Sequence, residues 1–283
     1  MLSDRWLLDP ADPDGAWRRL KPQQSLTTVH SVPAGAPRVP GAVRVVCISD
    51  THGMHRQLNV PAGDILLNAG DITRSGEPGQ IEDYLAWLGE QPHPHKVLVA
   101  GNHDITLHTD YYQRSWRRFH RRYGRPLDHG QTRTLLQQSP AVHYLEDELV
   151  EVAGLRIYGS PWQPTFYDWA FNATRGPEIS RYWSRIPDRV DVLVTHGPPL
   201  GRGDLTATGH RAGCLDLLQT IQGRVRPRFH VFGHIHEGYG ASTDGQTTYV
   251  NASTCTLRYR PTHPAFVFDV TPAPGPTAGG TGA

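Results

Sequence analysis

The chain has 283 residues, of which 28 are basic and 27 acidic, so its formal net charge is +1. A charge this close to zero argues against a protein that coats nucleic acid or an anionic membrane surface. The three cysteines form no CxxC pair and indicate neither a disulfide framework nor a thiolate zinc site. No apolar run approaches the roughly 18 residues of a membrane span, and the N-terminal residues lack the features of a signal peptide. We therefore expect a cytoplasmic protein that does not contact a membrane.

The sequence predicts one folded domain over residues 42–270. Pro, Asp and Gly recur through residues 1–41, and residues 271–283 hold no large apolar group. We therefore expect an irregular N-terminal extension and a disordered C-terminal tail. Short runs rich in Val, Ile or Leu predict buried strands at residues 43–48, 64–68, 96–100, 155–158, 191–195, 229–232, 247–251 and 265–270.

Apolar residues at helical spacing occur between several of these runs. They appear within residues 81–88 and 116–123, and more weakly within residues 215–221. Because strands and helices alternate early in the chain, the pattern predicts an α/β fold with partly parallel sheets. The closely spaced later strands indicate antiparallel additions to those sheets.

Five of the predicted strands end in side chains that can bind a metal ion. A single Asp or His after a strand is ordinarily a helix cap or a solvated loop residue. Five such ends in one chain favour a shared site, because ligands gather beyond the carboxyl ends of strands in α/β sheets. Two ends have D-x-H and H-x-H form, which places both donors on one side of an extended segment. The residues are Asp50, His52, Asp71, Asn102, His103, Asp104, His196, His234 and His236.

These side chains offer carboxylate, amide and imidazole donors without a thiolate, which predicts two divalent ions such as Mn, Fe or Zn. Hydrolytic metal pairs lie about 3.5 to 4 Å apart and need a bridging anion. Asp71 is the predicted bridge, since Gly70 lets the backbone come close. The remaining positive charge favours a phosphate ester, attacked at phosphorus by a metal-bridged hydroxide. His103 is the candidate acid for the leaving group, with Asp104 as its orienting carboxylate.

The motifs around these residues resemble the calcineurin-like metallophosphoesterases. VCISDTHG, GDILLNAGD, VAGNHD, THGPPLG and HVFGHIHEGYG occur in the family's order. Together with RIYGSPWQP and YVNASTC, they are similar to the metallophosphoesterase-domain-containing branch of the class III cyclic nucleotide phosphodiesterase-like group. The resemblance covers residues 42–270 and implies a sandwich of two mixed β-sheets flanked by helices. It also implies one metal held by Asp50, His52, Asp71 and His236, a second held by Asp71, Asn102, His196 and His234, and His103 as the catalytic histidine.

Two details separate this chain from other members of the superfamily. Asp71 is followed by Ile, Thr and Arg, and not by the Asp-Arg-Gly element of protein serine/threonine phosphatases. Activity on phosphoproteins is therefore disfavoured. His234 is present where some members of the branch have glycine and are attenuated, so we expect an active enzyme.

Residues 161–175 are dense in aromatic side chains that could stack on a nucleobase, which makes Trp162 and Phe166 candidate substrate-binding residues. Packing of this segment into the core is the alternative interpretation. The sequence thus favours a binuclear metal-dependent phosphodiesterase of cyclic nucleotides or other small phosphodiesters. Two alternatives stay open: a nuclease that binds single-stranded oligonucleotides through the arginines of residues 114–125, and a nucleotide-binding or scaffold protein with residual activity. The balanced charge argues against nucleic acid as a partner.

Overall fold

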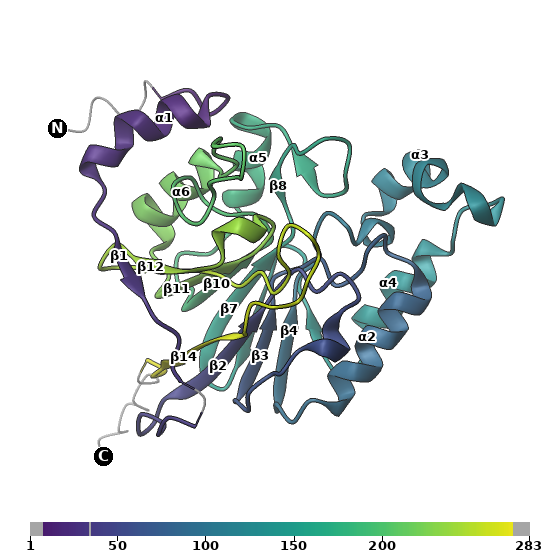
Figure 1. The fold of residues 1–283 in the computed structure, drawn as a ribbon, viewed down its shortest axis with the longest axis horizontal. Helices are drawn as coiled ribbons and strands as arrows, with labels where there is room; N and C mark the ends of the chain where they lie inside the picture. The colour runs from purple at the N-terminus through teal and green to yellow at the C-terminus, as the bar shows by residue number, and fades with distance from the viewer. Residues whose placement is uncertain (1–7, 34, 274–283) are drawn as a thin grey trace, which may run out of the picture.

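The computed structural model describes residues 8–33 and 35–273 and contains two large mixed β-sheets with helices beside them (Figure 1). The seven-stranded sheet has the order β1-β12-β13-β11-β10-β7-β6, and the five-stranded sheet has the order β14-β2-β3-β4-β5. This arrangement confirms the predicted sandwich of two mixed sheets flanked by helices.

The five-stranded sheet is built from the first predicted strands. Strands β2 (Val43–Ile48), β3 (Ile65–Asn68), β4 (His95–Leu98) and β5 (His143–Tyr144) are parallel neighbours in that order. Strand β14 (Phe266–Val270) pairs antiparallel with β2 at one edge. The parallel order puts the carboxyl ends of β2, β3 and β4 at the same edge of the sheet.

The larger sheet has a parallel centre and antiparallel edges. Its parallel strands are β7 (Leu155–Ser160), β10 (Val192–Thr195), β11 (Phe229–Phe232) and β13 (Thr248–Asn251). The strands β6 (Glu148–Val152), β12 (Gly240–Thr243) and β1 (Thr27–Val29) add antiparallel partners. The short strands β8 (Gln163–Pro164) and β9 (Asn172–Ala173) form a separate pair. The predicted antiparallel additions are therefore present.

Alternating side chains on the central strands fill two different cores. Val45 and Cys47 of β2 belong to the cluster between the sheets, together with Val194 of β10. Val46 and Ile48 belong to the cluster under the neighbouring helices. Because side chains alternate across a strand, a fully apolar run is required where both faces are covered. This requirement is why residues 45–48 of β2 are all apolar.

Helices cover the outer faces of both sheets (Figure 1). Helices α2 (Pro78–Glu90), α3 (Thr109–His120) and α4 (His129–Gln137) contribute apolar residues to the core of the five-stranded sheet. Helices α5 (Pro177–Trp183) and α6 (Leu215–Thr220) do the same for the seven-stranded sheet. None of the helices in residues 8–33 and 35–273 has the length and apolar character needed to cross a bilayer.

The described part of the N-terminal extension is more regular than predicted. Helix α1 (Pro13–Leu20) begins after Asp12, whose carboxylate accepts a hydrogen bond of 2.8 Å from the Gly15 N–H. This cap and the buried Trp17 and Leu20 explain why a Pro- and Asp-rich segment folds as a helix. Strand β1 then joins the edge of the larger sheet. Most of the tail predicted to be disordered, residues 274–283, lies outside the described residues.

Candidate metal centre

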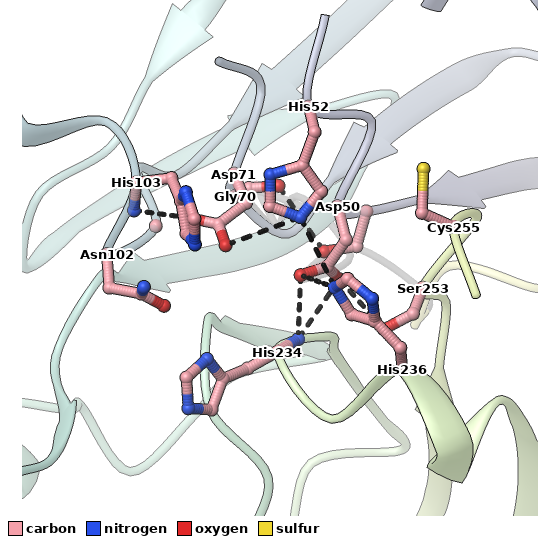
Figure 2. Close-up of polar contacts among 12 residues, drawn as sticks. Asp50, His52, Gly70, Asp71, Asn102, His103, His234, His236, Ser253 and Cys255 are labelled. Carbon is pink, nitrogen blue, oxygen red and sulfur yellow. Dashed lines mark hydrogen bonds and ion pairs between the residues drawn. The ribbon is translucent and has the colours of Figure 1, made fainter. Parts of the chain in front are cut away.

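Five loops meet where strands of both sheets end. Hydrogen bonds join loops of the two sheets: the His234 N–H donates to the Asp50 carboxylate at 3.0 and 3.1 Å. The His196 Nδ1 lies 2.8 Å from the Ala69 carbonyl oxygen, to which it donates. The structure thus brings together all seven predicted metal ligands, many of which are drawn in Figure 2: Asp50, His52, Asp71, Asn102, His196, His234 and His236.

Asp71 occupies the centre of this group. Its Oδ2 atom lies 3.8 Å from the Nε2 of His52 and 3.5 Å from the Nε2 of His196. Its other oxygen, Oδ1, accepts a hydrogen bond of 2.7 Å from the His103 backbone N–H. One carboxylate oxygen therefore faces imidazoles on both sides, the position that a bridging ligand between two cations would occupy.

The first candidate ligand set contains Asp50, His52 and His236, whose donor atoms lie within 4.8 Å of one another. The Oδ1 of Asp50 is 3.4 Å from the Nε2 of His236, and that atom is 3.2 Å from the Nε2 of His52. The Ser253 hydroxyl donates to the Oδ2 of Asp50 at 2.8 Å and fixes the carboxylate from behind. Sequence analysis quoted the YVNASTC motif that contains Ser253 but assigned this serine no role.

The second candidate set contains Asp71, His196 and His234, again with donor atoms within 4.8 Å. The Oδ1 of Asn102 lies 3.0 Å from the Nε2 of His196 and can complete this set. The two histidines of the GHIH motif are thus divided between the sets, with His234 in one and His236 in the other. A third set, His52, Asp71 and His103, overlaps both.

The tautomers of the histidines fit cation binding. The Nδ1 atoms of His52, His196 and His236 lie 3.3, 2.8 and 3.0 Å from the carbonyl oxygens of Thr73, Ala69 and Thr256. A carbonyl oxygen can only accept, so each Nδ1 carries a hydrogen, and the Nε2 of a neutral ring is left with a lone pair. The Nε2 atoms of His52 and His236 therefore face each other, which requires a proton or a metal ion between them.

The pKa values describe how the site balances its charge without metal. Burial alone would lower the pKa of His196, but the Asp71 carboxylate raises it to about 9. Burial opposes protonation of His236 in the same way, and Asp50 raises its pKa to about 9. Burial lowers the pKa of His52 to about 4. The two carboxylates thus hold protons on neighbouring imidazoles, and binding of two divalent ions would release them.

The backbone at the site is unusual. Asp50, His52 and His234 have left-handed φ angles of 53, 44 and 66°. The expectation that D-x-H and H-x-H lie on extended segments was therefore wrong, because the chain turns sharply as it leaves each strand. Gly70 has a φ of 106°, and a Cβ there would come within 2.6 Å of the His196 Nδ1. Glycine at this position lets the Asp71 loop approach His196.

His103 lies beside the candidate sets. Its ring is 4.7 Å from the His52 ring and is stacked on Trp169 with centroids 4.1 Å apart. Its Nδ1 donates to the Arg74 carbonyl oxygen at 2.9 Å, so the ring presents Nε2 as the free nitrogen. The ring is thus oriented by a backbone carbonyl and by an aromatic neighbour.

Asp104 does not have the orienting role that the sequence suggested. Its carboxylate accepts hydrogen bonds from the backbone of Gly101, Ile72 and Thr73, and from the Thr73 hydroxyl. The loop turns after His103, so the carboxylate is buried under the loop instead of beside the imidazole. Burial raises the pKa of Asp104 to about 6. Asp104 ties the loops after β3 and β4 together.

The two candidate substrate-binding aromatics have different positions. Trp162 is stacked on Tyr182 with centroids 3.8 Å apart, and its Nε1 donates to Asp147 at 3.1 Å. Trp162 therefore packs into the protein, as the alternative interpretation of this segment held. Phe166 is 40% exposed, and its ring lies edge-on to His234 at 5.2 Å. Phe166 is thus an exposed aromatic beside a candidate ligand.

Tyr259 is a second exposed aromatic at the site, and sequence analysis missed it. Its ring centroid lies 4.7 Å from that of His52 and 5.7 Å from that of His236. It is 43% exposed and has a left-handed φ of 54°. Tyr259 follows the YVNASTC motif by four residues, and only its proximity to the histidines in the fold identifies it.

Comparisons with known proteins identify the family of the chain. Residues 43–238 match the family model described as calcineurin-like phosphoesterase. The chain is 45% identical over 253 residues to metallophosphoesterase domain-containing protein 1 of Homo sapiens, covering 86% of this chain and 75% of that protein. It is 36% identical over 286 residues to UPF0046 protein C25E10.12 of Caenorhabditis elegans, covering 98% of this chain and 99% of that protein. The chain therefore belongs to the calcineurin-like phosphoesterase family and is a phosphoester hydrolase.

Proposed function

We propose that the protein is a binuclear metal-dependent phosphodiesterase that acts on cyclic nucleotides or other small phosphodiesters. The observation that carries the proposal is the position of the Asp71 Oδ2 atom, 3.8 Å from His52 Nε2 and 3.5 Å from His196 Nε2. A shared carboxylate oxygen between two sets of nitrogen and oxygen donors suits a pair of divalent ions.

The residues that would hold the ions follow from the two candidate sets. One ion would be bound by Asp50, His52 and His236. The other would be bound by His196, His234 and Asn102, and Asp71 would bind both ions. This donor set suits Mn, Fe or Zn, since it lacks a thiolate. Bound divalent ions would lower the pKa of a coordinated water and offset negative charge on the phosphoryl oxygens.

In this proposal His103 is the acid that protonates the leaving group. Its Nδ1–H is committed to the Arg74 carbonyl, so the proton that it can give or take is on Nε2. A protonated Nε2 would donate to the departing oxygen as the P–O bond breaks, leaving a neutral ring. Trp169 holds the plane of the ring by stacking, so the donor atom keeps a fixed direction.

Exposed aromatics support a nucleotide-like substrate. Phe166 lies against His234 in one candidate set, and Tyr259 lies against His52 and His236 in the other. The two rings therefore flank the candidate centre from different loops. A nucleobase next to the cleaved ester could stack on either ring, and such a stack contributes roughly 1 to 3 kcal/mol.

The nuclease alternative receives less support. Arg118 of helix α3 pairs with Asp168, and Arg122 just beyond the helix pairs with Glu77, so two arginines of the predicted basic face are neutralised.

The cysteines bear on the location of the protein. Within the described residues Cys47, Cys214 and Cys255 are free and buried, which suits the reducing cytoplasm that we propose as the location of the protein.

The test is a hydrolysis screen with the metal-loaded protein. Bis-p-nitrophenyl phosphate, 3′,5′- and 2′,3′-cyclic nucleotides, phosphomonoesters and a single-stranded oligonucleotide are compared at two salt concentrations. The proposal predicts preferential cleavage of the small diesters. Preferential cleavage of the oligonucleotide, falling steeply with salt, would favour the nuclease. Binding of AMP without hydrolysis of any ester would favour the scaffold alternative.

A further inference from the structure

A hollow of about 570 Å³ begins at the candidate metal ligand His236. Its walls come from the segment after β11 and from the loop before β14, and the residues that line it include His236, Glu237, Tyr239, Arg258, Arg260 and His263. The hollow is therefore continuous with one side of the candidate centre. Apart from His236, none of these residues has a part in the proposed cleavage of a simple diester.

Two arginines give this hollow its charge. Arg258 and Arg260 are exposed, and no hydrogen bond, ion pair or ring contact engages either guanidinium within residues 8–33 and 35–273. The single carboxylate in the wall, Glu237, already accepts a hydrogen bond of 2.6 Å from the Ala207 N–H. The wall therefore carries two arginines without a partner among the described residues and one carboxylate, Glu237, which already accepts a hydrogen bond.

The loop that carries the arginines is held in place. The Tyr259 N–H donates to the Thr256 carbonyl at 2.8 Å, and the Thr256 N–H donates to the Arg260 carbonyl at 2.9 Å. Tyr259 does not line the hollow and instead packs against the rings of His52 and His236. Because this tyrosine anchors the loop to the candidate centre, the flanking arginines stay next to it.

Two further lining side chains, Tyr239 and His263, are also fixed. Tyr239 and His263 are stacked with centroids 4.5 Å apart. The Tyr239 hydroxyl donates to the Pro264 carbonyl at 2.9 Å, and His263 Nδ1 donates to the Ser253 carbonyl at 2.9 Å. Both groups are thus satisfied within the protein, and the arginines are left as the wall's strong free donors.

We propose that this hollow binds a second phosphate group of the substrate, beyond the ester that is cleaved. The inference rests on the proposed phosphodiesterase activity and narrows its substrate to diesters that also carry a phosphate monoester. An arginine guanidinium offers parallel N–H donors that match the oxygens of a phosphate. A phosphate in the hollow would therefore give Arg258 and Arg260 the partner that they lack in the described part of the protein. A substrate without the second phosphate would leave the hollow unused.

The test compares substrates that share one diester bond. ApA has no terminal phosphate, whereas pApA carries one at its 5′ end and ApAp carries one at its 3′ end. We expect KM for one of the phosphorylated forms to be about tenfold lower than for ApA. In the double variant R258A/R260A this advantage should disappear, while cleavage of ApA and of bis-p-nitrophenyl phosphate stays within about twofold. Arg181→Ala, an exposed arginine on α5, is the matched control and should change nothing.

A binding measurement keeps this inference separate from the proposed activity. Calorimetry compares adenosine 3′,5′-bisphosphate with AMP on the metal-loaded wild type and on R258A/R260A. Tighter binding of the bisphosphate, lost in the double variant, supports the hollow as a phosphate site even if no diester is cleaved. Equal KM values for all three dinucleotides in the wild type would overturn the proposed phosphate site. Equal affinities of the wild type and R258A/R260A for the bisphosphate would overturn it as well. Failure to cleave any diester would contradict the proposed function alone.

Discussion

The Nε2 atoms of His52 and His236 lie 3.2 Å apart, although the Nδ1 of each ring already donates to a backbone carbonyl. Without metal, a proton on His236 lies between the two nitrogens, because, despite burial, Asp50 raises the pKa of His236 to about 9. A divalent ion can replace this proton and also bind the neighbouring buried carboxylate of Asp50. Metal binding should therefore stabilise the folded chain.

We first predict that Mn²⁺ or Zn²⁺ raises the melting temperature of the metal-free protein. At a free metal concentration of about 100 times Kd, the gain in unfolding free energy is about 2.7 kcal/mol for one site. Differential scanning calorimetry with and without EDTA measures the shift. Mg²⁺ at the same concentration is the control, since it prefers oxygen ligands. A melting temperature unaffected by every metal would contradict the ligand assignment.

Substitution His103→Ala should retain metal binding and slow turnover by about 10²- to 10⁴-fold on esters of poor leaving groups. The loss should be smaller for bis-p-nitrophenyl phosphate, because p-nitrophenolate needs little help from an acid. Steady-state kinetics on this ester and on a cyclic nucleotide give the two ratios, and elemental analysis gives the metal content. Loss of metal in this variant would show that His103 is a ligand.

Gly70→Ala should impair metal binding although the change adds a single methyl group. Its Cβ would lie 2.6 Å from His196 Nδ1 and 2.8 Å from the Ala100 carbonyl, at a φ of 106°. The matched control is Gly79→Ala in helix α2, where a Cβ meets nothing within 4 Å. The control should stabilise the protein by about 0.5 to 1 kcal/mol in urea unfolding. Equal metal affinity in both variants would contradict the close approach at Gly70.

Phe166→Ala should raise KM for cyclic nucleotides while leaving cleavage of a diester without a nucleobase less affected. A lost stack of roughly 1 to 3 kcal/mol corresponds to about 5- to 150-fold in KM. The control is Tyr123→Ala, which removes another aromatic of similar exposure, 43% against 40%. Unchanged KM for every nucleotide would leave Phe166 without a part in substrate binding.

The fold could be predicted largely from local sequence patterns. Runs such as residues 45–48 are apolar on both faces because they lie between helices and a second sheet, and such runs are visible in the sequence. Strand β1 escaped prediction because its residues are mostly exposed and its pairing comes from an edge position. Helix α1 carried a readable signal in Asp12 and Pro13, which the surrounding Pro and Asp residues obscured.

The residues of the candidate site that lie at the ends of predicted strands could be found from the sequence. Residues that lie farther along the loops could not. His196 follows β10 directly and Asp71 comes three residues after β3, so their positions at strand ends led to the inference that they converge. Tyr259 reaches the centre from a late loop without a recognisable pattern. Ser253 lies two residues after β13 in the YVNASTC motif, but its hydroxyl is not one of the metal donors that the pattern analysis considered. Asp104 was misplaced because adjacency to His103 in sequence suggested contact, whereas the loop sends the two side chains in different directions.

The most direct test of the central claim is the metal content of Asp71→Asn beside that of the wild type. Both proteins are loaded with Mn²⁺, freed of excess ion by gel filtration and analysed by mass spectrometry of the metal, and turnover of bis-p-nitrophenyl phosphate is measured on the same samples. Asp188→Asn, an exposed carboxylate paired with Arg224, serves as the control. A shared ligand predicts two ions per wild-type chain and the loss of bound metal together with turnover in Asp71→Asn. Two ions and full turnover in that variant would show that Asp71 does not join a metal pair.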